Sequence, residues 1–423
     1  MKINFMEAVQ IISGGTPSTK NPLYWGGSIP WLSVVDFGSV NKYVFATEKH
    51  ITDDGLHNSA TKMLHQNDII ISARGTVGAM AMLGKPMAFN QSCFGLRGKP
   101  EIINQDFLFY YLRFYMKNIT QKAQGSVFST INLDTFKSIE LDIPSIQNQK
   151  AIARILSNID RKIDNNNTIN AELEAMAKTI YDYWFLQFEF PDENGKPYKS
   201  SGGKMVYNEE LKREIPEGWE VSNIGSKDIY TSDYTANGSF AGLAENVKYN
   251  DGEPYAILVR IIDLKNDFSK PDDLVYVNKH AYNYLKKSNL RGGEIIICNV
   301  GDVGATFMCP NLSMPMTLGP NGIVINSEQY NDYLYLHFAS LLGQHSLNSI
   351  SSGSIQKKFN KTNFRELPLL FPENGVLREF NKIYDPIKLK ISNIWHENRE
   401  LASLRDFLLP LLMNGQVGFK EEV

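Results

Sequence analysis

The sequence predicts an α+β chain in which two pseudo-symmetric mixed α/β domains are separated by a long antiparallel coiled coil of two helices. Three observations lead to this prediction. An internal repeat runs through the chain, a strand-and-turn region opens each copy, and a long helix with apolar residues seven apart closes each copy. A period of more than 200 residues indicates a duplicated domain with a duplicated helix, because solenoid repeats are far shorter.

The repeat is clearest around two glycine-containing turns. The segment Asn67–Ala79 aligns with Gly293–Ala305 at an offset of 226 residues, and both segments carry three consecutive isoleucines before the turn. Farther along, Asn170–Leu173 aligns with Asn398–Leu401 at an offset of 228. The near-constant offset indicates that domain and helix were duplicated together.

Each copy should contain two buried strands followed by an aromatic helix. The expected strands are short, β-branched apolar runs bounded by turn residues. In the first copy they are Pro30–Asp36 and Ile69–Ile71, followed by a helix over Asp106–Met116; in the second they are Ala256–Asp263 and Ile295–Ile297, followed by a helix over Asp332–Leu342.

Two long helices have the spacing of a coiled-coil seam. Each contains two interleaved series of mainly apolar residues seven apart, and about 38 residues at 1.5 Å per residue give a length of about 55–60 Å. Asn170 and Asn398 occupy the same seam position, where a polar residue costs stability but fixes the register. Both asparagines pointing outward is the alternative. Pro386 is expected to mark a delayed helix start or a kink.

These elements divide the chain into six parts. The segment between the halves is rich in proline, glycine and charge, which is typical of a linker. The parts are a first domain at 1–145, a central helix at 146–189, a linker at 190–218, a second domain at 219–372, a C-terminal helix at 373–415 and a tail at 416–423.

Composition restricts the class of protein. With 43% hydrophobic and 21% charged residues, the 423-residue chain has the balance of a packed protein. Its net charge is −3, so few DNA phosphates would be neutralised and DNA binding by the chain alone should be weak. No apolar stretch reaches the length of a membrane span, and no signal peptide is evident. Three cysteines without a CxxC pair make disulfides and cysteine zinc sites unexpected, so a cytoplasmic location is expected.

Catalytic motifs are largely missing. The nearest approach to a nucleotide-binding loop ends at Pro86, where that motif needs a hydroxyl, and no metal-ligand spacing is found, so we predict no catalytic and no metal-binding residues. Asp192, Glu210 and Lys212 resemble the acid pair and lysine of metal-dependent nucleases. That chemistry needs carboxylates on adjacent buried strands, and the segment between them has no apolar strand, so we interpret it as a solvated linker.

Four features, in this order, carry a family resemblance. They are Ile11–Ser18 together with Tyr24–Trp31, the loop Ile71–Gly78, Ile215–Trp219 at the start of the second half, and the paired helices with their Asn-x-Glu-Leu strings. With them the sequence resembles the DNA-specificity (S) subunit of type I restriction–modification systems over essentially its whole length.

The resemblance implies a division of labour between chains. Each half would be a target-recognition domain that reads one part of a split double-stranded DNA sequence. The helices would form the spacer and position two methyltransferase (M) subunits, and restriction/translocase (R) subunits would join the complex. This chain would then be non-catalytic and bind no cofactor, with S-adenosylmethionine, ATP and Mg²⁺ on the partner subunits.

Residues that differ between the two halves are the candidates for DNA reading. Arg74 aligns with Val300 and Thr76 aligns with Asp302, although the scaffold around them matches. Arg74 has the side chain for a bidentate contact to guanine, with a surface ion pair as the alternative, and Lys357 and Lys358 suit phosphates. The predicted DNA-binding residues are Ser13, Gly14, Gly15, Thr16, Ser18, Ser72, Arg74, Thr76, Ser126, Ser129, Thr130, Thr231, Tyr234, Asn237, Asn299, Asp302, Ser354, Gln356, Lys357 and Lys358.

Among these residues and their neighbours, the glycines are expected mainly to allow backbone shapes that other residues resist. This applies to Gly14 and Gly15, and to the turn glycines Gly75, Gly78, Gly301 and Gly304. The tryptophans Trp25, Trp31 and Trp219 are expected in the core rather than stacked on bases.

Three other functions stay open from the sequence. The chain could be a stand-alone bivalent DNA-binding adaptor or a decoy that sequesters M subunits, which co-purification and methylation of a split site would distinguish. It could be a self-contained nuclease or methyltransferase, which the missing motifs disfavour. A coiled-coil structural protein would leave two strand-rich domains with unlike loops unexplained.

Overall fold

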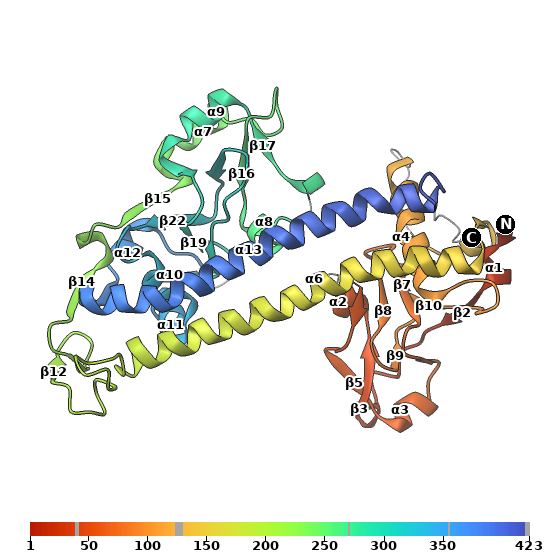
Figure 1. Ribbon diagram of the computed structural model, residues 1–423, viewed down its shortest axis with the longest axis horizontal. Helices are drawn as coiled ribbons and strands as arrows, with labels where there is room; N and C mark the ends of the chain where they lie inside the picture. The colour runs from red at the N-terminus through yellow and green to blue at the C-terminus, as the bar shows by residue number, and fades with distance from the viewer. Residues whose placement is uncertain (39–41, 123–129, 270, 354–355, 419–423) are drawn as a thin grey trace, which may run out of the picture. The chain divides into compact units, whose positions relative to one another are not determined.

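The computed structural model describes residues 1–38, 42–122, 130–269, 271–353 and 356–418, which form two compact units. The first unit comprises Met1–Thr168 with His396–Val423, and the second comprises Ile169–Trp395. Each unit therefore holds one mixed α/β domain and parts of both long helices (Figure 1).

The first domain has two main sheets that share one core. Isoleucines of the central strand are fully buried, as their β-branched run predicts. One sheet has the order β2 (Val9–Ser13), β10 (Cys93–Gly98), β7 (Ile69–Ser72), β8 (Met80–Leu83), β4 (Tyr43–Val44), and the other β5 (Lys49–Ile51), β3 (Trp25–Leu32), β9 (Met87–Phe89), β6 (Met63–Leu64). A strand pair joins β1 (Lys2–Asn4) to β11 (Glu140–Asp142), and the helices are α1 (Phe5–Ala8), α2 (Val34–Phe37), α3 (Asp53–His57), α4 (Gln105–Lys122) and α5 (Leu133–Lys137).

The second domain repeats this topology. Its sheets run β15 (Tyr230–Asp233), β22 (Gly322–Asn326), β19 (Ile295–Cys298), β20 (Thr306–Met308) and β17 (Tyr276–Val277), β16 (Ala256–Val259), β21 (Met316–Leu318), β18 (Asn289–Leu290), with β14 (Glu220–Asn223) paired to β23 (Pro368–Phe371). Its helices are α7 (Phe240–Asn246), α8 (Ile261–Lys265), α9 (Lys279–Tyr284), α10 (Asn331–Ala339), α11 (Leu341–Ser349) and α12 (Lys361–Arg365). Two similar α/β domains, as the sequence predicted, are thereby confirmed.

Two predicted strands are shorter than expected. In the expected strand Pro30–Asp36, β3 ends at Leu32 and helix α2 follows. In the expected strand Ala256–Asp263, β16 ends at Val259 and helix α8 follows. The reason is a capping contact that hydrophobic pattern alone does not show: the carboxylates of Asp36 and Asp263 accept hydrogen bonds from the backbone N–H groups three residues earlier, at 2.7 and 2.9 Å.

The aromatic helix is continuous in the first domain and broken in the second. In the first domain α4 continues unbroken, whereas in the second the equivalent segment divides into α10 and α11. Ser340 makes the break, because its hydroxyl accepts a hydrogen bond from the backbone N–H of Gly343 and caps α11.

The long helices are α6 (Ile146–Tyr181), extended by a π-helical turn η2 (Asp182–Leu186), and α13 (Asn374–Met413). They begin 228 positions apart, at the offset of the repeat. The delayed start expected from Pro386 is wrong, because α13 begins at Asn374 and Pro386 lies in its interior.

Within each unit the two helices run antiparallel. In the first unit, Asp160 of α6 contacts Arg405 of α13, and the later residue Asn166 contacts the earlier residue Asn398. In the second unit the ring of Trp184 lies 5.7 Å from that of Phe380. The predicted antiparallel pairing is confirmed.

Asn398 contacts Asn166 and Asn167 of α6. Asn398 accepts a hydrogen bond from Asn166 at 2.9 Å and donates one to Asn167 at 2.8 Å. Asn170 lies in the second unit, where its buried Oδ1 has no hydrogen-bond partner among the described residues. Residues at the same repeat position face each other only at the midpoint of an antiparallel pair, which is why Asn398 meets Asn166 instead. A register role for Asn170 and Asn398 stays a prediction.

The segment between the halves contains more structure than a solvated linker. It forms a hairpin of β12 (Met205–Asn208) and β13 (Arg213–Pro216), and Phe188, Phe190 and Trp219 are buried beside it. Asp192 accepts two backbone N–H groups at 2.8 Å, from Asn194 and Lys196, so its carboxylate caps a turn. The hairpin was not predicted, and its strand β12, which lies between Asp192 and Glu210, has no buried residue.

No helix in the described part of the chain is both long and apolar enough to cross a bilayer.

Candidate nucleic-acid interface

The glycine-containing turns of the two domains have the same backbone hydrogen bonds. In the first turn, Ser72 N–H bonds Ala79 O at 2.9 Å and Gly78 N–H bonds Ser72 O at 3.0 Å. In the second, Cys298 N–H bonds Ala305 O at 2.8 Å and Gly304 N–H bonds Cys298 O at 2.9 Å. The repeat seen in the sequence is therefore a repeat of geometry.

Four glycines allow these turns. Gly75 and Gly78 have φ of +78° and +85°, and Gly301 and Gly304 have φ of +89° and +94°. These values lie in the left-handed region that side-chain-bearing residues rarely occupy. The turn glycines are thus needed for backbone shape, as predicted.

A second segment lies against each turn. Ile131 N–H bonds Ala73 O at 2.9 Å in the first domain, and Phe359 N–H bonds Asn299 O at 3.1 Å in the second. Both contacts join the turn to the chain just before the short helix, α5 or α12. In the second domain Gly301 N–H also bonds Lys357 O at 3.2 Å. Two stretches about 55–60 residues apart in sequence thereby form one platform in each domain.

The platform residues on the turn are partly structural. Ser72 is fully buried and donates its hydroxyl to Thr76 O. Cys298 takes the same place in the second domain, donates its thiol to Val300 O at 3.3 Å, and has a pKa raised by burial. The residues that follow are exposed, among them Arg74 and Thr76 in the first turn and Asp302 in the second.

Comparison with known proteins agrees with this architecture. Residues 4–175 match the model of a family described as type I restriction modification DNA specificity domain. The specificity subunit of the type I restriction enzyme MjaIX from Methanocaldococcus jannaschii is 27% identical, over 97% of this chain and 92% of that protein. This chain is therefore similar, over nearly its whole length, to a type I restriction enzyme specificity subunit.

Two further relatives show how far the likeness extends. The specificity subunit of the HindI enzyme from Haemophilus influenzae is 24% identical, over 72% of this chain and 74% of that protein. The crystal structure of a type I restriction–modification S subunit from M. genitalium superposes with a TM-score of 0.53 at 18% identity, covering 97% of this chain and 95% of that one. The second likeness shows that the fold is shared.

In the first domain, Arg74 is the exposed cation of the platform. It is exposed, and no carboxylate among the described residues forms an ion pair with it. Thr76 and Thr130 are also exposed, on the turn and on the segment beside it. Ser126 and Ser129 lie outside the described residues.

The loop after β2 is closely packed. A Cβ atom on Gly14 would lie 2.1 Å from Asn90 O, and one on Gly15 would lie 2.3 Å from the backbone at Ala60 and Thr61. Thr16 hydrogen-bonds the side chain of Gln91. These two glycines therefore serve close packing, whereas Ser13 and Ser18 have exposed side chains.

The tryptophans pack around this loop. Trp31 is buried and donates its indole N–H to Gly15 O at 3.2 Å, and Trp25 donates to Ser18 O at 3.2 Å. Trp219 is buried in the second unit. The predicted core position is confirmed for Trp31 and Trp219, while Trp25 is half-buried.

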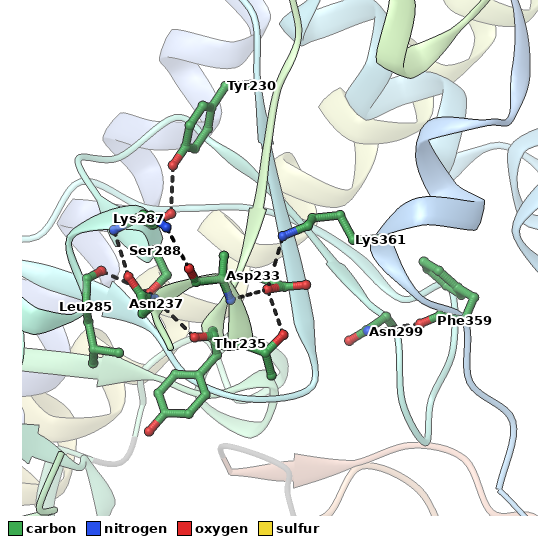
Figure 2. A network of polar contacts seen from close by, with 12 residues as sticks. Tyr230, Asp233, Thr235, Asn237, Leu285, Lys287, Ser288, Asn299, Phe359 and Lys361 are labelled. Atoms are coloured by element: carbon green, nitrogen blue, oxygen red, sulfur yellow. Dashed lines mark hydrogen bonds and ion pairs between the residues drawn. The ribbon is translucent and has the colours of Figure 1, made fainter. Parts of the chain in front are cut away.

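In the second domain a polar network fixes the loop after β15. Asn237 donates to Tyr234 O at 3.1 Å and to Ser288 Oγ at 2.8 Å, and it accepts from the backbone N–H of Lys287 at 2.9 Å (Figure 2). Both its donor and its acceptor groups are used inside the protein. Burial raises the pKa of Tyr234, and Thr231 donates to Ile229 O at 3.3 Å.

Two more predicted residues of the second domain have internal partners. Asn299 donates to Phe359 O at 3.0 Å, which holds the turn against the neighbouring segment (Figure 2). Asp302 forms an ion pair with Lys265 at 2.5 Å, although its side chain stays 61% exposed. Gln356, Lys357 and Lys358 are exposed, and Ser354 lies outside the described residues.

The sequence missed the partners in this network. Lys361 lies 3.4 Å from Asp233, and Tyr230 donates to Lys287 O at 2.7 Å. These pairs are separated by 128 and 57 residues, so no local motif connects them. Lys265, the partner of Asp302, is likewise remote in sequence. Only the three-dimensional fold brings them together.

The described residues contain no group of three or more His, Cys, Asp or Glu side chains placed to hold a metal ion. The candidate interface offers hydrogen-bond donors, acceptors and cations on a platform that occurs once in each domain.

Proposed function

We propose that this chain is the DNA sequence-specificity subunit of a type I restriction–modification complex, with each half reading one part of a bipartite target. The observation that carries the proposal is the repeated platform with unlike exposed residues. Arg74 and Thr76 stand where the second domain has Val300 and Asp302, although the turn hydrogen bonds are the same. Sequence is discriminated by donors and acceptors at base edges, so two unlike platforms suit two unlike half-sites.

Partner subunits would perform the chemistry. The chain would be non-catalytic, while M subunits carry S-adenosylmethionine and methylate adenine, and R subunits carry ATP and Mg²⁺ and cleave DNA. The net charge of −3 supports this, because partners would have to supply much of the phosphate-binding surface.

A surface kept in both halves supports binding of one partner in two copies. Glu172 and Met176 of α6 are exposed, and so are Glu400 and Leu404, their counterparts 228 positions later in α13. Positions i and i+4 lie on one face of a helix. Two domains that recognise different half-sites need different loops, whereas a partner that binds in two copies needs the same surface twice. The partners proposed for this face are the two M subunits.

The test is a map of methylated adenines in the host genome. A strain with the gene should show two short half-motifs separated by a constant gap, and deletion of the gene should remove both. Methylation that persists unchanged after deletion would overturn the proposal. A purified chain that methylates or cleaves DNA without partners would favour the self-contained enzyme instead.

The second candidate function is a stand-alone bivalent DNA-binding adaptor or a decoy that sequesters M subunits. Neither predicts methylation of a split motif, and only the decoy predicts co-purification with M subunits.

A further inference from the structure

The second unit contains a pocket that the proposed DNA reading does not use. Its volume is about 160 Å³, and it lies among the end of α6 with the π-helical turn η2, the hairpin residue Arg213, helices α10 and α11, and strand β23. Apolar side chains including Phe185 and Leu369 form its walls, and Leu342 at its edge is 40% exposed, so the pocket reaches the surface. π-Helical turns within long helices occur frequently at functional sites.

One polar atom of this pocket has no partner. The side chain of His337 is 4% exposed, and its Nδ1 lies 3.1 Å from the hydroxyl of Tyr181. Its Nε2 is buried without any hydrogen-bond partner among the described residues. Buried polar atoms are nearly always hydrogen-bonded, so an unpaired one that lines a pocket indicates a missing group. In the tautomer in which Tyr181 donates to Nδ1, the imidazole carries its proton on Nε2.

A cation stands at the same pocket without an anion. Among the described residues, no carboxylate pairs with Arg213 and no acceptor receives a hydrogen bond from its guanidinium. The guanidinium carbon lies 5.2 Å from the centre of the Phe188 ring. Burial and then the charge of Arg213 lower the pKa of His337 to about 4, so the imidazole is neutral at pH 7.

The histidine and the arginine are absent from the equivalent place in the first unit. Leu409 stands at the repeat position of Tyr181, Phe107 at that of Tyr333, and Tyr111 at that of His337. All three first-unit residues belong to a hydrophobic core. The duplicated scaffold therefore packs without a histidine here, and the arginine comes from a hairpin that has no counterpart in the first half. The unpaired groups are an addition to the fold.

We infer that this pocket binds a small carboxylate anion with a short apolar tail. The planar guanidinium of Arg213 matches a carboxylate bidentately, and the Nε2–H of His337 supplies a further donor. Phe185 and Leu369 offer apolar surface for the tail. The bound anion joins the hairpin to α10, so binding should stabilise the second unit.

The probe is isobutyrate, titrated into the full-length chain during thermal unfolding. The Tm should rise by about 2–4 °C and then saturate, because a ligand that binds only the folded state stabilises it. Isobutyramide, a neutral compound of nearly the same shape, and sodium chloride at equal ionic strength should leave the Tm unchanged. An equal rise with either control, or no saturable rise with isobutyrate, would overturn the inference.

Variants locate the effect. Arg213→Met should weaken isobutyrate binding at least about tenfold, since a charge-assisted bidentate contact is lost, whereas Arg365→Met, an exposed arginine elsewhere in the unit, should not. A second readout protects against variants that fold poorly: the imidazole NMR signal of His337 in the unaltered chain, assigned by its absence in His337→Gln, should shift with isobutyrate. An unmoved signal would contradict binding at this pocket.

The same carboxylate chemistry could come from a free metabolite or from an acidic side chain of a partner subunit. Repeating the titration on the assembled complex distinguishes the two. A free anion predicts the same response as in the isolated chain, and a partner side chain predicts that the response disappears on assembly.

Discussion

At the scale of single residues, exposure and internal hydrogen bonding divide the predicted DNA-binding residues into two groups. The side chains of one group, Ser72, Asn237 and Asn299, form hydrogen bonds within the protein. Arg74 and Lys358 are exposed without such partners among the described residues. Sequence comparison of the halves could find the turn but could not separate these groups, because the bonds of Asn237 and Asn299 reach residues 50–60 positions away.

Arg74→Ala should relax reading at one half-site only. Loss of one bidentate arginine–guanine contact costs about 1–3 kcal/mol of discrimination against the wrong base. The measurement is competition binding by the assembled complex with DNA altered at each half-site in turn. Lys85→Ala, which removes an exposed cation beyond the other end of β8, is the control. Equal weakening on every sequence would instead make Arg74 a phosphate contact.

Protonation of His337 should make the second unit less stable in acid. Its pKa is lowered from about 6.5 in the unfolded chain to about 4 in the folded one, first by burial and then by Arg213. The unfolded state therefore binds more protons between these values. The contribution of neutral His337 to the free energy of unfolding is fully present above about pH 6.5 and is lost as pH falls toward 4. At pH 5 the loss is about 2 kcal/mol.

Chemical denaturation at pH 5 and pH 7 measures this effect. His337→Gln should reduce the difference between the two pH values by about 2 kcal/mol. His345→Gln, an exposed histidine on the adjacent α11, should leave it as it is. An unchanged difference in His337→Gln would show that other groups set the acid sensitivity.

At the scale of elements, the helix pair combines an apolar seam with buried polar contacts. In the first unit, the carboxylate of Asp160 accepts from Arg405 at 2.9 Å and from the hydroxyl of Tyr110, and both Asp160 and Arg405 are buried. The heptad spacing was predictable from apolar periodicity, whereas the antiparallel direction was a hypothesis that the contacts confirm. The pairing of Asn166 with Asn398 was not, because sequence does not give the offset between antiparallel helices.

Breaking the ion pair from one side should be costly. Arg405→Met removes the guanidinium that pairs with the buried Asp160 carboxylate and should destabilise the chain by about 3–5 kcal/mol. Adding Asp160→Asn, which keeps an acceptor for Tyr110, should recover a large part of that loss. Denaturant unfolding of both single variants and the double variant gives the coupling energy. Additive losses would mean that the two charges act independently.

The repeated helix face should control how many partners bind. Met176→Asp and Leu404→Asp each place a charge on a side chain that is about half exposed, so folding should be retained while one of two M subunits is lost. Mass measurement of the assembled complex gives the count. Ala175→Asp, exposed on a different face of α6, is the matched control. Two M subunits retained in both variants would exclude this face as the docking surface.

At the scale of the whole molecule, duplication explains both what the halves share and what they do not. The sheet order, the turn hydrogen bonds and the helix starts repeat, whereas the exposed loop residues differ. The domain topology could be foreseen as two similar α/β halves because the repeat is strong in sequence. The hairpin between the halves could not, because its buried aromatic residues and strands have no second copy for comparison.

The most direct test of two independent readers is a domain exchange. Residues 1–145 are replaced by the corresponding domain of another specificity subunit, and the methylated adenines are mapped after co-expression with the M subunit. The account predicts that one half-motif changes while the other half-motif and the gap stay the same. A change in both half-motifs, in a complex that still assembles with two M subunits, would contradict it.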